Sequence, residues 1–167
     1  YLLTRAGLWK ESDALLRSNL ERSHSAYYLM SQLGSNARKL GRADEALGWY
    51  RQAYEKSVGP ATRLQWGAGY LSALVELTPQ DTAGIERAAA ALIDDAALQP
   101  HAFYERSARS LQRAGQRLGD WNTTPQRASA LKRLRTRLDA VCAKLPATDL
   151  QRATCDALLS AAAPRVG

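Results

Sequence analysis

The chain has 167 residues, 46% of them hydrophobic, which is enough to bury one substantial core, so we expect a single domain. It is rich in alanine and arginine and has one phenylalanine, a composition that favours an almost wholly helical fold. The formal net charge of +7 would suit an acidic partner, but the chain lacks the interleaved aromatic and basic residues of nucleic-acid binders and the ~20 apolar residues of a membrane span.

The first part of the chain repeats similar residues at a spacing of 34 positions. Gly7 is followed by Gly41, and Leu16 by Tyr50. This period is typical of helix-turn-helix repeats. Such repeats usually form surfaces that bind other proteins, so we expect an interaction domain without an active site.

The first copy, residues 1–24, is shorter than the second. A full repeat needs about a dozen helical residues before Gly7. Only residues 1–6 precede it, so we interpret the sequence as a fragment of a longer protein. We expect a helix from about Trp9 to Arg22, which the Ser23-His24-Ser25 segment ends. Its inner face would comprise Leu8, Ser12, Leu15 and Leu16.

The second copy, residues 27–60, resembles the tetratricopeptide repeat. The matching positions are Met30, Leu33, Gly34, Ala37, Gly41, Ala46, Tyr50 and Ala53. Small residues at Gly34 and Ala46 let two helices approach closely, and Gly41 ends the first helix. The resemblance implies an all-α, right-handed array of antiparallel helix pairs, about eight helices in total. Its inner groove would present Tyr28, Arg38 and Lys39.

Beyond Gly59 and Pro60 the spacing of 34 fails, although helix signals continue. We expect two degenerate helix pairs at residues 61–98 and 101–144. Their helices would run from about Ala61 to Leu77, from Asp81 or Thr82 to Leu98, from Pro100 to Gly119, and from Pro125 to Leu145. A capping box from Thr148 to Gln151 predicts a last, capping helix over residues 149–162.

Arginines recur along the helix expected after Pro100, three and four positions apart. They are Arg106, Arg109, Arg113 and Arg117. This spacing places them on one face, turned away from Phe103, Leu111 and Leu118, where they could bind an acidic partner segment. The alternative is a solvated helix face on which nearby acids such as Glu105 reduce the repulsion between the arginines. A second basic group would lie on the outer face of the next helix: Lys132, Arg133, Arg135 and Arg137.

The two cysteines, Cys142 and Cys155, flank the expected turn at Pro146. In an oxidising compartment they could form a disulfide, whereas in the cytosol they would be packed thiols. Their spacing does not fit a thioredoxin-type redox pair. His24 and His101 lie far from both in sequence, so we expect no metal site, no cofactor and no active site.

The whole chain resembles the helical C-terminal region of bacterial secreted thioredoxin-family proteins. Tyr27-Tyr28, Gly41 to Tyr50, Gly59 to Gly67 and Cys142 to Cys155 carry this resemblance. It implies a periplasmic or secreted protein in which a disulfide is favoured, with the redox residues in a domain before Tyr1. The chain would then position a partner or substrate for the oxidoreductase to which it is joined, and its protein or peptide partner could be that missing domain. The alternative is a general peptide-binding scaffold, periplasmic or cytoplasmic, unrelated to redox chemistry.

Overall fold

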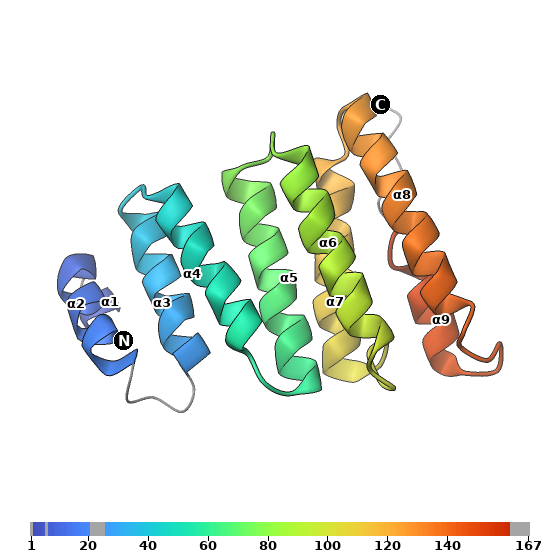
Figure 1. The fold of residues 1–167 in the computed structure, drawn as a ribbon, viewed down its shortest axis with the longest axis horizontal. Helices are drawn as coiled ribbons and strands as arrows, with labels where there is room; N and C mark the ends of the chain where they lie inside the picture. The colour runs from blue at the N-terminus through green and yellow to red at the C-terminus, as the bar shows by residue number, and fades with distance from the viewer. Residues whose placement is uncertain (1, 6, 21–25, 161–167) are drawn as a thin grey trace. The chain divides into compact units, whose positions relative to one another are not determined.

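A computed structural model describes residues 2–5, 7–20 and 26–160 of the chain. Within these ranges the secondary structure consists of helices, without strands, which confirms the predicted all-α class (Figure 1). The helices fall into two compact units, Tyr1–Val58 and Gly59–Gly167, where the sequence predicts a single domain. No described helix is both long enough and apolar enough to cross a membrane.

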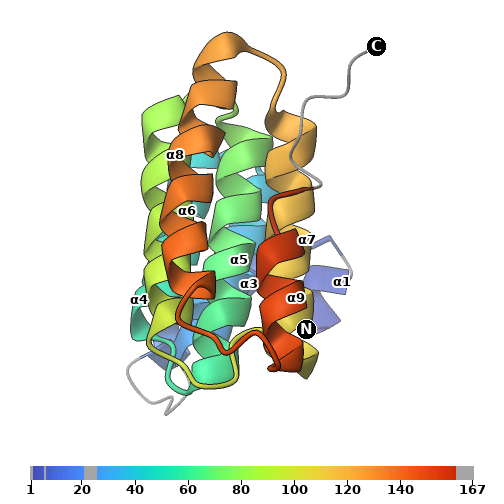
Figure 2. The ribbon, with the colours of Figure 1, turned by 90° about the vertical axis from the view of Figure 1, so that its right-hand side faces the viewer.

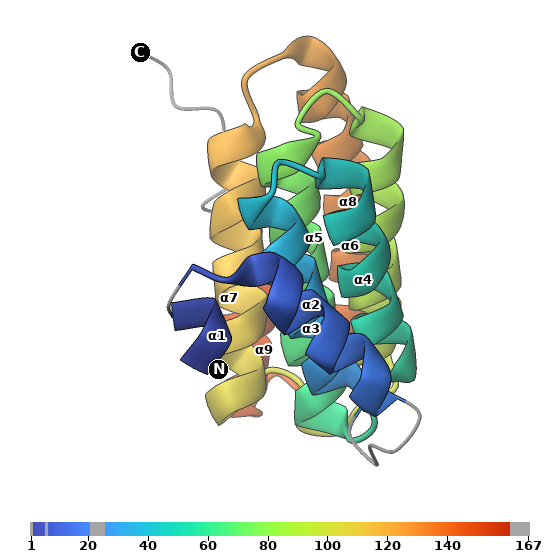
Figure 3. The same ribbon diagram turned by 90° about the vertical axis from the view of Figure 1, so that its left-hand side faces the viewer.

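In the described part of the N-terminal unit there are four helices, of which α3 and α4 form an antiparallel pair (Figure 3). They are α1 (Leu2–Arg5), α2 (Trp9–Asn19), α3 (Ala26–Lys39) and α4 (Ala43–Lys56). Helix α3 packs against both α2 and α4. It ends before Gly41, whose φ of +74° is a conformation that glycine adopts most readily.

Close approach of α3 and α4 depends on Gly34. A Cβ at this position would lie 2.8 Å from Cε1 of Tyr50, and Ala46 on the facing helix is fully buried. The sequence pattern predicted this close approach. A Cβ at position 34 would displace the Tyr50 ring, so the packing of the two helices favours glycine there.

Helix α2 buries a narrower face than the sequence predicts. Ser12 and Leu16 are buried, but Leu8 and Leu15 are 44% and 56% exposed. The Ser12 hydroxyl forms hydrogen bonds with Thr4 Oγ1 and with the Asn36 amide, so this side of the helix carries a polar contact. The helix ends at Asn19, and the expected break at residues 23–25 lies outside the described residues.

The C-terminal unit has five helices between residues 59 and 160 (Figure 2). They are α5 (Pro60–Leu77), α6 (Thr82–Ala97), α7 (Glu105–Trp121), α8 (Pro125–Cys142) and α9 (Leu150–Ala157). Helix α5 packs against both α6 and α7, α6 packs against α8, and α8 packs against α9. Contact with two helices explains why α5 is apolar over much of its surface.

Helices α5 and α7 run parallel to each other. Near their first turns Arg106 donates a hydrogen bond to Gln65, 41 positions earlier. At their far ends the Trp121 indole donates to the carbonyl of Pro79, 42 positions earlier. Helices α6 and α8 are likewise bridged by residues 47 and 43 positions apart. Neighbouring positions on parallel helices of this unit are therefore more than 40 residues apart in sequence. This explains why the spacing of 34 residues fails here.

Helix α7 begins at Glu105, not at Pro100 as predicted, and it extends to Trp121 instead of Gly119. The side chain of Gln151 explains the later start. It donates to the carbonyl of Pro100 and accepts from the amide of Phe103, so this backbone is bonded to α9 instead of to a helix of its own. Phe103 itself is buried, as the sequence indicates.

The last helix differs from the prediction at both ends. Asp149, and not Thr148, caps it by accepting a hydrogen bond from the amide of Gln151. The helix ends at Ala157 instead of near Ala162, and the last expected residues lie outside the described ranges. Leu158 and Leu159 then enter the core, where the Leu158 carbonyl occupies the space that a Cβ on Gly115 would need.

Candidate functional site

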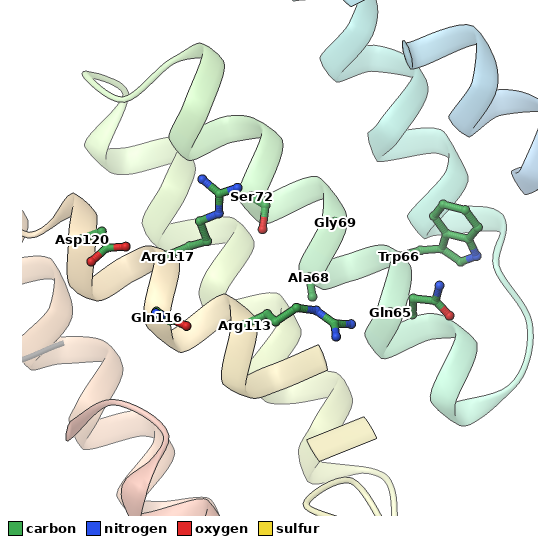
Figure 4. A pocket seen from close by; sticks show the side chains of 9 residues that line it. All are labelled: Gln65, Trp66, Ala68, Gly69, Ser72, Arg113, Gln116, Arg117 and Asp120. Carbon is green, nitrogen blue, oxygen red and sulfur yellow. The ribbon is translucent and has the colours of Figure 1, made fainter. Parts of the chain in front are cut away.

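A cavity of about 570 Å³ lies between the parallel helices α5 and α7 (Figure 4). From α5 it is lined by Gln65, Trp66, Ala68, Gly69 and Ser72, and from α7 by Arg113, Gln116, Arg117 and Asp120. A Cβ placed on Gly69 would meet no atom within 4 Å, so the space above this residue is open. In Figure 4 the Arg113 and Arg117 side chains extend from α7 toward the side of α5 that carries Gln65 and Ser72.

The structure places all four arginines of the predicted stripe on the exposed side of α7, while Leu111 and Leu118 on the same helix are buried. Arg106 donates to Gln65 at 2.9 Å, and Arg113 donates to Ser110 at 3.3 Å. Within the described ranges, none of the four guanidinium groups forms an ion pair with a carboxylate. Two of them, Arg113 and Arg117, line the cavity together with Asp120, so the lining carries two positive charges and one negative charge.

The second basic group, on α8, has a different environment. Arg133 donates two hydrogen bonds to Glu86 at 2.7 and 2.8 Å, and Arg137 donates two to Asp94 at 2.8 and 2.9 Å. These hydrogen bonds hold the pKa of Glu86 and that of Asp94 below their ordinary values, although partial burial of each carboxylate acts in the opposite direction. The charges of Arg133 and Arg137 are thus neutralised within the protein.

The residues expected to line a groove of the tetratricopeptide type lie along α3 in the N-terminal unit. Tyr28 is 53% exposed and its ring centre is 4.8 Å from that of Tyr27. Lys39 is exposed and Arg38 is half-buried. These three residues belong to one compact unit and the arginine-lined cavity to the other.

Cys142 and Cys155 form a disulfide with a Cα–Cα distance of 5.6 Å, and both are buried. Cys142 is the last residue of α8, and Cys155 lies on α9, which starts at Leu150 after the turn at Pro146. His101 is exposed in the turn before α7, and His24 lies outside the described residues. Among the residues that the structure describes, no group of three or more histidine, cysteine or acidic side chains could hold a metal ion.

Sequence reasoning identified the arginines but missed the facing residues of α5. Gln65, Gly69 and Ser72 are spaced four and three apart, so they share one face of a helix that is otherwise largely apolar. That break in the apolar pattern was the available signal. A cavity lined by guanidinium, amide and hydroxyl groups can bind carboxylates and backbone polar groups.

In comparisons with known proteins, no protein family model, no curated protein and no solved structure matches the chain. The resemblance to secreted thioredoxin-family proteins therefore stays a prediction from the residues that carry it.

Proposed function

We propose that this chain is a noncatalytic helical domain that binds a segment of a partner protein in the cavity between α5 and α7. The observation that carries the proposal is the open cavity of about 570 Å³ with arginines that have no carboxylate partner among the described residues. Uncompensated charge in a concave site favours a ligand of opposite charge. Because Arg113 and Arg117 have no carboxylate partner among the described residues, we assign that role to another molecule.

We further propose that the domain positions its partner for a thioredoxin-like oxidoreductase to which it is joined, in an oxidising compartment such as the periplasm. The resemblance of Gly59 to Gly67 and of the cysteine segment supports this setting. The disulfide also supports it, because disulfides persist in oxidising compartments and are rare in the cytosol. Two free thiols in protein purified from an oxidising compartment would contradict this setting.

A random peptide library displayed on phage tests the cavity as a binding site. The key variant is Gly69→Leu, which fills the cavity with a side chain whose Cβ meets no atom within 4 Å. Replacing a glycine within a helix also favours the helix, so the variant should fold. The matched control is Gly48→Leu on α4, where a Cβ meets open space as well.

We expect the selected peptides to bind the unmodified protein and the Gly48→Leu variant, and to lose binding to the Gly69→Leu variant. The loss would show that an occupied cavity excludes the peptide. If every selected peptide binds the three proteins equally, the cavity is not the binding site and the proposal is wrong.

A further inference from the structure

We propose that the occupant of this cavity is a short, extended segment of a partner protein with carboxylate side chains at alternate positions. This inference rests on the proposed function and specifies the chemistry of the partner. It follows from the spacing of three arginines, from the polar groups beside them and from the residues that close the two ends of the site.

The arginines match the repeat of an extended chain. Arg109, Arg113 and Arg117 are each four positions apart, which corresponds to steps of about 6 Å along a helix. Side chains on one face of an extended segment repeat every two residues, or about 6.6 Å. Two glutamates or aspartates at alternate positions would therefore meet Arg113 and Arg117 in the cavity, and a third would meet Arg109, which lies outside the cavity lining on the same exposed face of α7. The long arginine side chains absorb the small difference in spacing.

The polar groups in the cavity favour an extended segment over a helix. The Ser72 hydroxyl and the Gln116 amide line the cavity, and neither has a hydrogen-bond partner within the described ranges. An extended segment has free backbone N–H and C=O groups that such side chains can bind. A helical segment already pairs these groups internally and would leave Ser72 and Gln116 unused.

The two ends of the site limit the length of the acidic run. At one end the Arg106 guanidinium is bonded to Gln65, which bridges α5 and α7. At the other end the carboxylate of Asp120 lines the cavity and would repel a further acid. The basic stripe is thus about three charges long between these points. This suits a short acidic peptide better than a long polyanion such as a nucleic acid.

Defined peptides and fluorescence anisotropy test the inference. The first probe is a capped, labelled seven-residue peptide with three glutamates at alternate positions and serines between them. The second has the same composition with the glutamates adjacent, and the third has glutamines in place of the glutamates. We expect the alternating peptide to bind about fivefold more tightly than the adjacent one, the glutamine peptide to bind most weakly, and affinity to fall as salt is raised.

Protein variants then locate the bound peptide. Arg113→Gln combined with Arg117→Gln should weaken binding of the alternating peptide at least tenfold, and Arg109→Gln alone about fivefold. Lys132→Gln combined with Arg135→Gln removes the same net charge from α8 and should leave binding unchanged. All five residues are exposed or half-buried, so the variants should fold, which circular dichroism will check.

The outcomes separate this inference from the proposed function. Equal binding of the alternating and adjacent peptides, or undiminished binding to the Arg113→Gln, Arg117→Gln variant, would overturn the inference. Displayed peptides that depend on Gly69 but contain no acidic residues would overturn it too, while leaving the cavity as a binding site. Tighter binding of a ten-nucleotide oligothymidylate, with the same sensitivity to the arginine variants, would assign the surface to nucleic acid instead.

Discussion

The C-terminal unit carries two basic helix faces that look alike in sequence and differ in structure. On α8, Arg133 and Arg137 are four positions apart, and the neighbouring parallel helix α6 supplies Glu86 and Asp94 to pair with them. On α7, Arg113 and Arg117 are also four positions apart. The cavity-lining residues of the parallel neighbour α5 include Gln65, Gly69 and Ser72, and none of its lining residues is an acid.

A run of arginines on a helix is therefore not by itself a binding site. The residues on the facing helix determine whether each guanidinium group is already paired within the protein, because a paired group is not available to a ligand. Arg133 and Arg137 of the α8 face are therefore paired within the protein, whereas Arg113 and Arg117 of the α7 face have no carboxylate partner among the described residues. Three changes to the protein test this difference between the α7 and α8 faces.

The largest effect is expected from removing the disulfide, which supports both faces. Cys155 holds α9 to the end of α8, and Gln151 on α9 binds the backbone before α7. The bond closes a loop of 13 residues, so Cys142→Ser with Cys155→Ser should lower the free energy of unfolding by about 3 kcal/mol. Urea unfolding, with and without reductant, measures this loss.

The double serine variant is its own control, because reductant should destabilise the unmodified protein and leave the variant unaffected. Intact mass after alkylation gives a second measurement. The unfolded, unreduced protein should resist alkylation at both cysteines. If both cysteines alkylate without reductant, they are two packed thiols. The proposal of an oxidising compartment then loses the structural observation that supports it.

Much of the fold could be predicted from local patterns. Gly41, the Gly59–Pro60 pair and the Thr124–Pro125 pair fix helix ends through short-range geometry, so the end of α3 and the starts of α5 and α8 lie within about two residues of the prediction. The start of α7 could not be predicted, because a distant side chain, that of Gln151, binds the backbone after Pro100. The exposure of Leu8 and Leu15 depends in the same way on which face of α2 meets its neighbours.

The candidate site was predictable in only one of its two halves. The spacing of Arg106 to Arg117 indicates one exposed face, since helical periodicity alone decides which residues share a side. The sequence could not tell that Gln65 and Ser72 lie opposite, because these residues are more than 30 positions away and reach α7 only through tertiary packing. The same limit explains why the α7 and α8 stripes could not be distinguished.

An intermediate effect is expected from giving α5 the carboxylate that α6 already has. The change Ser72→Glu places an acid in the cavity with Arg117, so the open face should become a paired one. Binding of the alternating acidic peptide should weaken about tenfold, because one guanidinium is occupied and an acid now repels the ligand. Unfolding stability should rise by less than about 1 kcal/mol, as is usual for exposed ion pairs. Anisotropy and urea unfolding measure the two quantities.

The control for this change is Ser72→Gln, because a glutamine side chain has nearly the size of glutamate and carries no charge. It should leave most of the affinity in place. An equal loss with glutamine would mean that bulk, and not charge, excludes the peptide, and the electrostatic account of the contrast would fail.

The smallest effect is expected from the paired face, as a dependence of stability on pH. Arg133 holds the pKa of Glu86 below its ordinary value of 4.5, so the unfolded chain takes up a proton first as the pH falls. The contribution of Glu86 to stability is thus fully present above pH 4.5 and is lost as the pH falls through the lower folded pKa. In Glu86→Gln this contribution is absent at every pH. The gap in urea midpoint between the two proteins should therefore be widest near pH 7 and narrow below pH 4.5.

Asp94→Asn should show the same trend, starting from the ordinary aspartate pKa of 3.8. Its gap should be smaller because the Asp94 side chain is 56% exposed, against 25% for Glu86. By contrast, Arg113→Gln should leave the acid dependence unchanged, because Arg113 has no carboxylate partner among the described residues. A pH-dependent gap for Arg113→Gln as large as that for Glu86→Gln would show that the α7 face is also paired internally, and the distinction between the two faces would be lost.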